Sequence, residues 1–331
     1  LTMKYGILGI GQAGLRHFEA FKKIKNLKLI GFIENNLSKA KSFEKKFKAK
    51  HCKKLKDLLL LKPNFIVLSL PHNQRAIPII SCIKKDINLL IEKPLATDPV
   101  ELKKILPYLN KKKLTHSISF VHRYRKEVLK TNELIQTNKI GKIKFISEMM
   151  ISQKSSQLPK WIDNKNMSGG GVLIYNAIHS IDKLVFFAKS KIVKVFSKYN
   201  NINNSLKVED AICVILVFKN NVVANLVSVF APYNVLPKWE TKIFGEKGSI
   251  DLQIREGLTL KTNSGEQVYN FSKNYKKFGP NHNFFYQAQS YVNSLSKNKK
   301  PFVDVKDGIE SVKIVNAIYK SIKLNKTINI S

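Results

Sequence analysis

The sequence of 331 residues is poor in cysteine. Its three cysteines, Cys52, Cys82 and Cys213, are odd in number and far apart. This pattern gives neither a disulfide framework nor the ligand spacing of a zinc site. We therefore expect unreactive thiols and no bound metal.

Long apolar runs are also missing. No uninterrupted run approaches the roughly 18 residues of a membrane-spanning helix, and the first residues enter an apolar stretch without a charged leader. Because 44% of the residues are hydrophobic, the chain has enough apolar material for the buried cores of about two domains. We expect a cytoplasmic protein that has no membrane partner.

Acidic residues and arginine are scarce. The chain has 23 acidic and 58 basic residues, a net charge of +35, and only five of the basic residues are arginine. Phosphate and base recognition usually favours arginine, and the lysines here are spread along the whole chain. We expect solvated lysines and no nucleic-acid partner. A basic nucleic-acid binder is the alternative, and it would require salt-sensitive retention of DNA.

Glycine, by contrast, is placed in a pattern near the N-terminus. Gly9, Gly11 and Gly14 in "KYGILGIGQAGLRH" have the spacing G-x-G-x-x-G. An apolar strand is predicted before them, over residues 4–9, and a helix after them, over residues 13–24. The apolar face predicted for this helix comprises Leu15, Phe18, Phe21 and Ile24. A strand–turn–helix context is what gives the motif its specificity for a dinucleotide.

Each glycine has an expected role. Gly9 allows a tight turn, Gly11 lets the backbone approach a pyrophosphate, and Gly14 lets helix and strand pack closely. Glu34 ends the next apolar stretch, about 20 residues further on. Its carboxylate suits the ribose hydroxyls of NAD and would repel the extra phosphate of NADP. We predict NAD as the cofactor, and nearby Lys39 keeps NADP possible.

Further near-continuous apolar stretches, at residues 64–71 and 87–94, are typical of buried parallel strands, and "LTHSISFVHRYR" predicts another strand that ends near Phe120. With the intervening helical stretches they predict a doubly wound α/β sheet over residues 1–121. Ligands bind at the carboxyl ends of such strands. The expected cofactor contacts are Gly9, Gly11, Gln12, Ala13, Gly14, Glu34, Pro71, Glu92 and Lys93.

Two residues are candidates for proton and charge chemistry. Lys93 ends a predicted buried strand, where its ammonium can bind a substrate oxygen and favour an alkoxide. His179 lies in "SGGGVLIYNAIHSID" on a predicted helix, three residues before Asp182. A histidine titrates near neutral pH, which suits proton exchange with a hydroxyl.

These segments together resemble the Gfo/Idh/MocA family of nicotinamide-dependent oxidoreductases. The resemblance rests on "GIGQAG", "EKPLATD", "VHRYR" and "GGGVLIYNAIHSID", in that order along nearly the whole chain. It implies that Lys93 is the catalytic lysine and His179 the acid or base. Three residues depart from the pattern: Tyr175 replaces a common aspartate, Ala177 a frequent glycine, and Arg75 a histidine.

The remaining residues, 122–331, predict a second α+β domain with a large, mainly antiparallel open sheet. Asn220 and Asn221 suit a hairpin between two strands, and a final helix, expected over residues 305–324, is open to packing on the first domain. In the family that the chain resembles, the exposed face of such a sheet forms a dimer. We expect a homodimer or homotetramer.

The resemblance implies a sugar, sugar nucleotide or cyclitol substrate with a secondary alcohol or ketone. The residues expected to bind it are Arg123, Tyr124, Trp161, Tyr175, Asn176 and His179. A solvated hinge and surface loop is the alternative for Arg123 and Trp161. Because of Tyr175 and Ala177, a non-catalytic dinucleotide-binding sensor or scaffold of the same fold is the alternative to a dehydrogenase.

Overall fold

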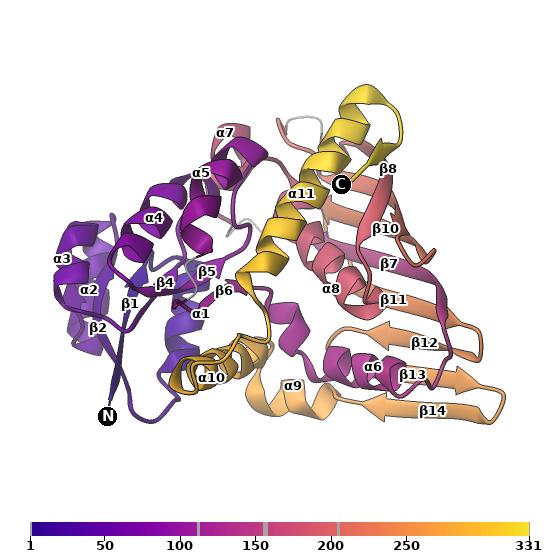
Figure 1. Ribbon diagram of the computed structural model, residues 1–331, viewed down its shortest axis with the longest axis horizontal. Helices are drawn as coiled ribbons and strands as arrows, with labels where there is room; N and C mark the ends of the chain where they lie inside the picture. Colours follow the sequence, from indigo (N-terminus) through magenta and orange to yellow (C-terminus); the bar gives the residue numbers. More distant parts are fainter. Residues whose placement is uncertain (1, 111–112, 155–157, 204–205, 331) are drawn as a thin grey trace. The chain divides into compact units, whose positions relative to one another are not determined.

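The computed structural model describes residues 2–110, 113–154, 158–203 and 206–330. The chain forms two compact units (Figure 1). Unit 1 comprises Leu1–Val121 and Asn281–Ile309, and unit 2 comprises His122–Pro280 and Glu310–Ser331.

Unit 1 contains a parallel six-stranded sheet in the order β3-β2-β1-β4-β5-β6. Its strands are β1 (Met3–Leu8), β2 (Leu27–Ile33), β3 (Lys50–His51), β4 (Phe65–Leu68), β5 (Asn88–Glu92) and β6 (His116–Ser119). Its helices are α1 (Gln12–Phe21), α2 (Leu37–Phe47), α3 (Leu55–Leu60), η1 (His72–Gln74), α4 (Ala76–Lys84), α5 (Pro99–Leu109) and α10 (His282–Ser296). The strand order reverses beside β1, as in a doubly wound fold. The predicted parallel sheet is confirmed.

The helix α10 belongs to unit 1 although it follows unit 2 in the sequence. Phe284, Ala288 and Tyr291 lie on one of its faces and are buried in the core of unit 1, where the Tyr291 ring lies 5.4 Å from the ring of Phe65. The second domain expected over residues 122–331 therefore differs from unit 2, which lacks residues 281–309. The reason is that the apolar face of α10 is buried against α1 and the sheet of unit 1. In α1, Leu15 is 37% exposed, so its expected place on the buried face is wrong.

Unit 2 contains a nine-stranded sheet in the order β14-β13-β12-β11-β7-β10-β9-β8-β15. Its strands are β7 (Ile143–Gln153), β8 (Ile192–Asn200), β9 (Ala211–Phe218), β10 (Val223–Ala231), β11 (Lys238–Gly245), β12 (Gly248–Gln253), β13 (Gly257–Thr262), β14 (Gly265–Asn270) and β15 (Ile328–Asn329). All neighbours are antiparallel except β7 and β10. The mainly antiparallel sheet and the hairpin between β9 and β10 are confirmed, with Asn221 at φ 66° in the turn.

Helices cover one face of this sheet (Figure 1). The remaining helices of the described residues are η2 (Val121–Tyr124), α6 (Lys126–Gln136), η3 (Lys160–Asp163), α7 (Lys165–Ser168), the π-helical η4 (Leu173–Ala177), α8 (Ile178–Ala188), α9 (Ser272–Phe278) and α11 (Val305–Leu324). Of these, η2 and α11 begin in unit 1 and continue in unit 2. Helix α8 packs on β7, and α6 on β12 and β13. Among the described residues, one helical stretch, 165–188, is long and apolar enough to cross a membrane, but 78% of its most apolar 18-residue window is buried, which makes it weak evidence for a span.

Candidate active site

The turn between β1 and α1 contains two kinds of glycine. Gly9 adopts φ +87°, and a Cβ atom there would lie 2.7 Å from the carbonyl oxygen of Ser69. A Cβ atom on Gly14 would overlap the carbonyl oxygen of Gly9, whereas one on Gly11 would meet no atom within 4 Å. The chain's own packing therefore requires Gly9 and Gly14. At Gly11 the backbone faces open space.

The start of α1 is suited to an anion. Gly11 is its N-cap and provides no side-chain hydrogen bond, so the first N–H groups, from Gln12 and Ala13 onward, lack a cap that would compete with a ligand. Nearby, the Ser69 hydroxyl is buried and has no hydrogen-bond partner among the described residues. The pyrophosphate of a dinucleotide fits this turn, which combines open space over Gly11, an uncapped helix start and the unpaired hydroxyl of Ser69.

Glu34 follows β2 and is held by the backbone. Its carboxylate accepts hydrogen bonds from the N–H groups of Ile10, at 3.1 Å, and Asn36, at 3.0 Å. The Lys39 ammonium lies 3.8 Å from it. The carboxylate is thus fixed beside the glycine turn, where the expected ribose contact stays a prediction.

The parallel sheet collects the expected cofactor contacts at one edge. The glycine turn follows β1, Glu34 follows β2, Pro71 follows β4, and Lys93 follows β5. Because the carboxyl ends of parallel strands lie at the same edge of a sheet, these residues lie along one line in unit 1. This edge is where ligands bind in doubly wound folds.

Glu92, the last residue of β5, has its carboxylate bound inside unit 1. Oε1 lies 2.7 Å from Nε2 of His17, which is itself fully buried. Burial alone raises the pKa of the Glu92 carboxyl, but the hydrogen bond and charge of His17, together with Lys93 and Arg75, bring it down to about 2. Glu92 therefore anchors α1 to β5, and its expected contact with the cofactor stays a prediction.

Lys93 is half-buried and follows β5 directly, with a cis peptide bond to Pro94. Burial lowers the pKa of its ammonium to about 8, helped by the charges of Arg75 and Arg16 and opposed by Glu92. At neutral pH most of the group is still protonated. It is therefore a hydrogen-bond donor that also releases a proton more readily than an exposed lysine.

In unit 2, a glycine run leads into the helix that carries His179. A Cβ atom on Gly170 would overlap the Tyr319 hydroxyl, and one on Gly171 would overlap the carbonyl oxygen of Glu209. The buried Glu209 carboxylate accepts hydrogen bonds from Gly171 N at 2.9 Å, Leu173 N at 3.2 Å and the Tyr319 hydroxyl at 2.7 Å. Burial raises the pKa of this carboxyl. A carboxylate at a helix start is favourably placed, so Glu209 fixes where this helix begins.

A π-helical turn, Leu173–Ala177, precedes α8. It contains the half-buried Tyr175 and Asn176. The Asn176 amide donates to Ser152 Oγ at 3.3 Å, and the Tyr175 ring lies 5.8 Å from the ring of Phe230. Such turns occur frequently at functional sites. Substrate binding by both residues stays a prediction.

His179 lies in the first turn of α8 and is 8% exposed. Its ring stacks on His122, with centroids 4.4 Å apart and planes 14° apart. The His122 ring in turn lies 5.5 Å from the ring of Trp239. Neither of these two neighbours was predicted, because no local pattern in the sequence brings η2 or β11 to α8.

Arg123 and Asp182 form a buried pair. Asp182 accepts two hydrogen bonds from the guanidinium, from Nε at 2.9 Å and Nη2 at 2.6 Å, so the pair fastens the segment after residue 121 to α8. Tyr124 is buried, and Trp161 is half-buried in η3. The roles expected for these residues in binding substrate stay predictions.

Glu148 is a buried acid that the sequence patterns above did not single out. This buried residue of β7 accepts hydrogen bonds from Ser180 and Thr241, each at 2.6 Å, and lies 3.0 Å from the buried ammonium of Lys183. It ties α8 to two strands. A signal was present, because Glu148 occupies a buried position in the alternating pattern "FISEMMIS", where an acid needs partners.

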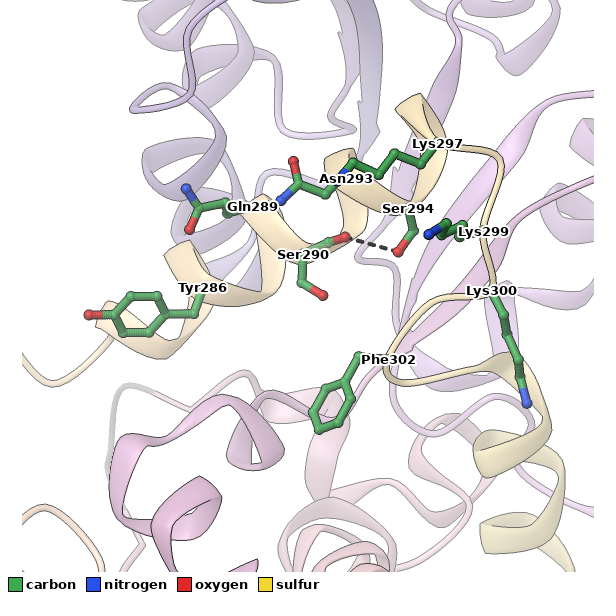
Figure 2. A pocket seen from close by; sticks show the side chains of 9 residues that line it. All are labelled: Tyr286, Gln289, Ser290, Asn293, Ser294, Lys297, Lys299, Lys300 and Phe302. Atoms are coloured by element: carbon green, nitrogen blue, oxygen red, sulfur yellow. Dashed lines mark hydrogen bonds between the residues drawn. The ribbon is translucent and has the colours of Figure 1, made fainter. Parts of the chain in front are cut away.

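A pocket of about 470 Å³, with mostly polar lining residues, lies in unit 1 (Figure 2). It is lined by Tyr286, Gln289, Ser290, Asn293, Ser294, Lys297, Lys299, Lys300 and Phe302. Most of these side chains extend from one side of α10, and Ser294 Oγ donates to the carbonyl oxygen of Ser290 at 3.0 Å. None of them belongs to the glycine turn or the strand ends.

Comparison with known proteins agrees with this geometry. Residues 3–120 match the model described as an oxidoreductase family with an NAD-binding Rossmann fold, and residues 132–330 match the C-terminal alpha/beta domain of the same family. The chain belongs to the Gfo/Idh/MocA family. Unit 1 thus contains the family's NAD-binding region. A bound cofactor explains why the space over Gly11 is open.

Relatives within the Gfo/Idh/MocA family include myo-inositol 2-dehydrogenase of Thermotoga maritima, 21% identical over 99% of this chain and 98% of that protein. A dehydrogenase of 1-carboxy-3-chloro-3,4-dihydroxycyclohexa-1,5-diene from Comamonas testosteroni is 22% identical over 70% of this chain and 59% of its own length. A D-glucoside 3-dehydrogenase of Escherichia coli is 22% identical over 56% of this chain and 53% of its own length.

Solved structures show the same fold. An oxidoreductase from Agrobacterium radiobacter in complex with NAD+, L-tartaric acid and magnesium has a TM-score of 0.90 at 14% identity, over 99% of this chain and 98% of that one. Myo-inositol 2-dehydrogenase from Lactobacillus plantarum has a TM-score of 0.85 at 21% identity over 100% of both chains.

Proposed function

We propose that this Gfo/Idh/MocA member transfers a hydride between NAD and a secondary alcohol or ketone of a sugar, sugar nucleotide or cyclitol. The observation that carries the proposal is the place of Lys93 at the end of β5, on the sheet edge that also carries the glycine turn and Glu34. The relatives named for myo-inositol, a cyclic dihydrodiol and a D-glucoside support a ring substrate with hydroxyl groups.

In the proposed reaction, the Lys93 ammonium donates a hydrogen bond to the substrate oxygen and stabilises the negative charge that develops there during oxidation. The His179 imidazole takes the hydroxyl proton, and returns it in the reverse direction. The bound nicotinamide supplies the hydride acceptor or donor. The alcohol thus loses its hydroxyl proton to the protein and its carbon-bound hydrogen, as hydride, to the cofactor.

We further propose that the protein is a cytoplasmic homodimer or homotetramer without nucleic-acid or membrane partners. One feature that supports self-association is an apolar outer face on the unit 2 sheet, opposite α6 and α8. It comprises Phe145, Met149, Ile151, Cys213, Ile215, Val217, Val223, Val227, Val229 and Phe244. The exposed, unpaired thiol of Cys213 agrees with a reducing compartment.

The proposal is tested by titrating the purified protein with NADH and NADPH and then screening sugars and cyclitols for changes in nicotinamide absorbance. We expect NADH to bind and at least one polyol to be oxidised.

Lys93→Met should lower kcat by about 10²–10³-fold, the usual cost of losing one donor to a developing oxyanion, while NADH still binds. Lys84→Met on α4 is the matched control. Normal turnover by Lys93→Met would refute the role assigned to Lys93. Cofactor binding by the parent without turnover of any polyol would favour the alternative, a non-catalytic dinucleotide-binding sensor or scaffold of the same fold.

A further inference from the structure

Arg75 is a buried arginine between the ends of two strands of unit 1. It is 3% exposed and follows η1 directly. Its guanidinium donates four hydrogen bonds to main-chain carbonyl oxygens. Nε and Nη2 donate to Leu70, at 2.9 and 2.8 Å, and Nη1 donates to both Glu92 and Pro94, at 2.5 Å each.

The carbonyls on either side of Lys93 are therefore held by one atom of Arg75. The same guanidinium holds the carbonyl of Leu70, the residue before Pro71 in the turn after β4. This arrangement needs a planar group with donors on both edges, which arginine has and which lysine and histidine lack. The geometry explains why this chain has arginine at a position where histidine was expected from its resemblance to the family.

We propose that Arg75 is a positioning residue that holds Lys93 in place against the turn at Leu70 and Pro71. The proposal rests on the proposed role of Lys93. By fixing the main chain before and after Lys93, Arg75 limits where the ammonium can move at the sheet edge. A displacement of about 1 Å at a reacting group costs about 10²-fold in rate, so this restraint matters to the reaction.

The charge of Arg75 has a second, supporting effect. Burial lowers the pKa of its guanidinium to about 10, so the group is still charged at neutral pH. That charge also contributes to the lowered pKa of Lys93. Arg75→Lys retains a positive charge and loses the planar fork, whereas Arg75→Met loses both. The two variants therefore separate geometry from charge.

The experiment compares Arg75→Lys and Arg75→Met with the parent and with Gln74→Met, a change at the exposed neighbouring residue. The first readout is hydrogen–deuterium exchange of peptides covering residues 67–75 and 88–97. The second is kcat, KM and the Kd for NADH. We expect Arg75→Met to exchange about 10-fold faster in these two segments, because a local opening becomes easier there, and to lose about 10²-fold in kcat with little change in Kd. The kcat of Arg75→Lys should lie between that of Arg75→Met and that of the parent.

Two results would overturn the inference. If Arg75→Met exchanges residues 88–97 at the same rate as the parent and has the same kcat, Arg75 does not restrain the main chain around Lys93. Faster exchange throughout unit 1, equal in the Lys and Met variants, would show a general packing role. If the parent binds NADH but turns over no polyol, the proposed function fails, and the exchange data alone decide whether Arg75 holds the Lys93 turn.

Discussion

Gly11 and Gly14 lie in one turn but are subject to different constraints. Gly11 has φ −70° and ψ −171°, which any residue adopts, and a Cβ atom there would meet nothing. Gly14 lies against the carbonyl oxygen of Gly9 and has no room for a side chain. Folding therefore tolerates alanine at Gly11 and not at Gly14, whereas a bound pyrophosphate would exclude it at Gly11 as well.

The substitution Gly11→Ala should weaken NADH binding and leave folding intact. Losing one hydrogen bond to a charged group costs about 1.5–3 kcal/mol, or about 10–100-fold in Kd. The free energy of unfolding should stay the same or rise by about 0.4–1 kcal/mol, because alanine restricts the unfolded chain. Gly14→Ala should instead lower it by about 1–3 kcal/mol through overpacking. Fluorescence titration and urea unfolding measure both quantities, and an equal loss of stability in the two variants would contradict this distinction.

At the scale of the element, the helix carrying His179 is positioned by two buried carboxylates. Glu209 binds the N–H groups at its start, and Glu148 binds Ser180 and lies against Lys183 on α8. Their partners come from distant parts of the chain: Tyr319 on α11 and Thr241 on β11. The helix is therefore fixed by polar contacts as well as by its apolar face.

Replacing Tyr319 by Phe removes one donor to the buried Glu209 carboxylate and should lower the free energy of unfolding by about 1–3 kcal/mol. Burial already holds the pKa of Glu209 above its ordinary value of 4.5, and losing this donor raises it further. The folded protein then binds a proton that the unfolded chain has released, so stability falls as pH rises above about 4.5. Urea unfolding from pH 4 to pH 8 should show a loss that grows with pH. Tyr199→Phe, at an exposed position, is the control, and a pH-independent loss would contradict the account.

At the scale of the whole molecule, helices cover one face of the unit 2 sheet, and the other face is mostly apolar over β7, β9 and β10. Side chains alternate along β7, so Glu148 contacts α8 whereas Met149 and Ile151 lie on the other face. In the register of the sheet, Met149 is opposite Val227, which is opposite Cys213. An apolar band therefore crosses three strands, as is typical of an interaction surface.

We expect the protein to sediment as a dimer or larger oligomer, and the substitution Ile215→Glu to shift it toward monomer. Ile215 is 46% exposed within one chain, so a carboxylate there is tolerated in the monomer but is costly in an apolar interface. Leu60→Glu, at a 77% exposed position in unit 1, makes the same kind of change elsewhere and should leave the oligomer intact. Sedimentation velocity distinguishes these outcomes, and a monomeric parent would refute the proposed assembly.

Much of the fold could be predicted because its signals are local. Apolar runs locate β4, β5, β9 and β10. The closing segment, by its resemblance to the family, predicts a last helix over Val305–Leu324, the bounds that the structure has. The glycine spacing likewise predicts the turn before α1. These features depend on residues close together in the chain, which short-range sterics and hydrophobic periodicity determine.

The sequence by itself determined the parallel sheet, the glycine turn and the position of Lys93 at a strand end, because each follows from neighbouring residues. Only the tertiary structure decided that Arg75 binds the carbonyls around Lys93 and that Glu209 meets Tyr319. It also decided that α10 belongs to unit 1. The reason is physical: a buried polar group must find partners wherever the fold brings them, and no local pattern in the chain encodes which distant residue that is.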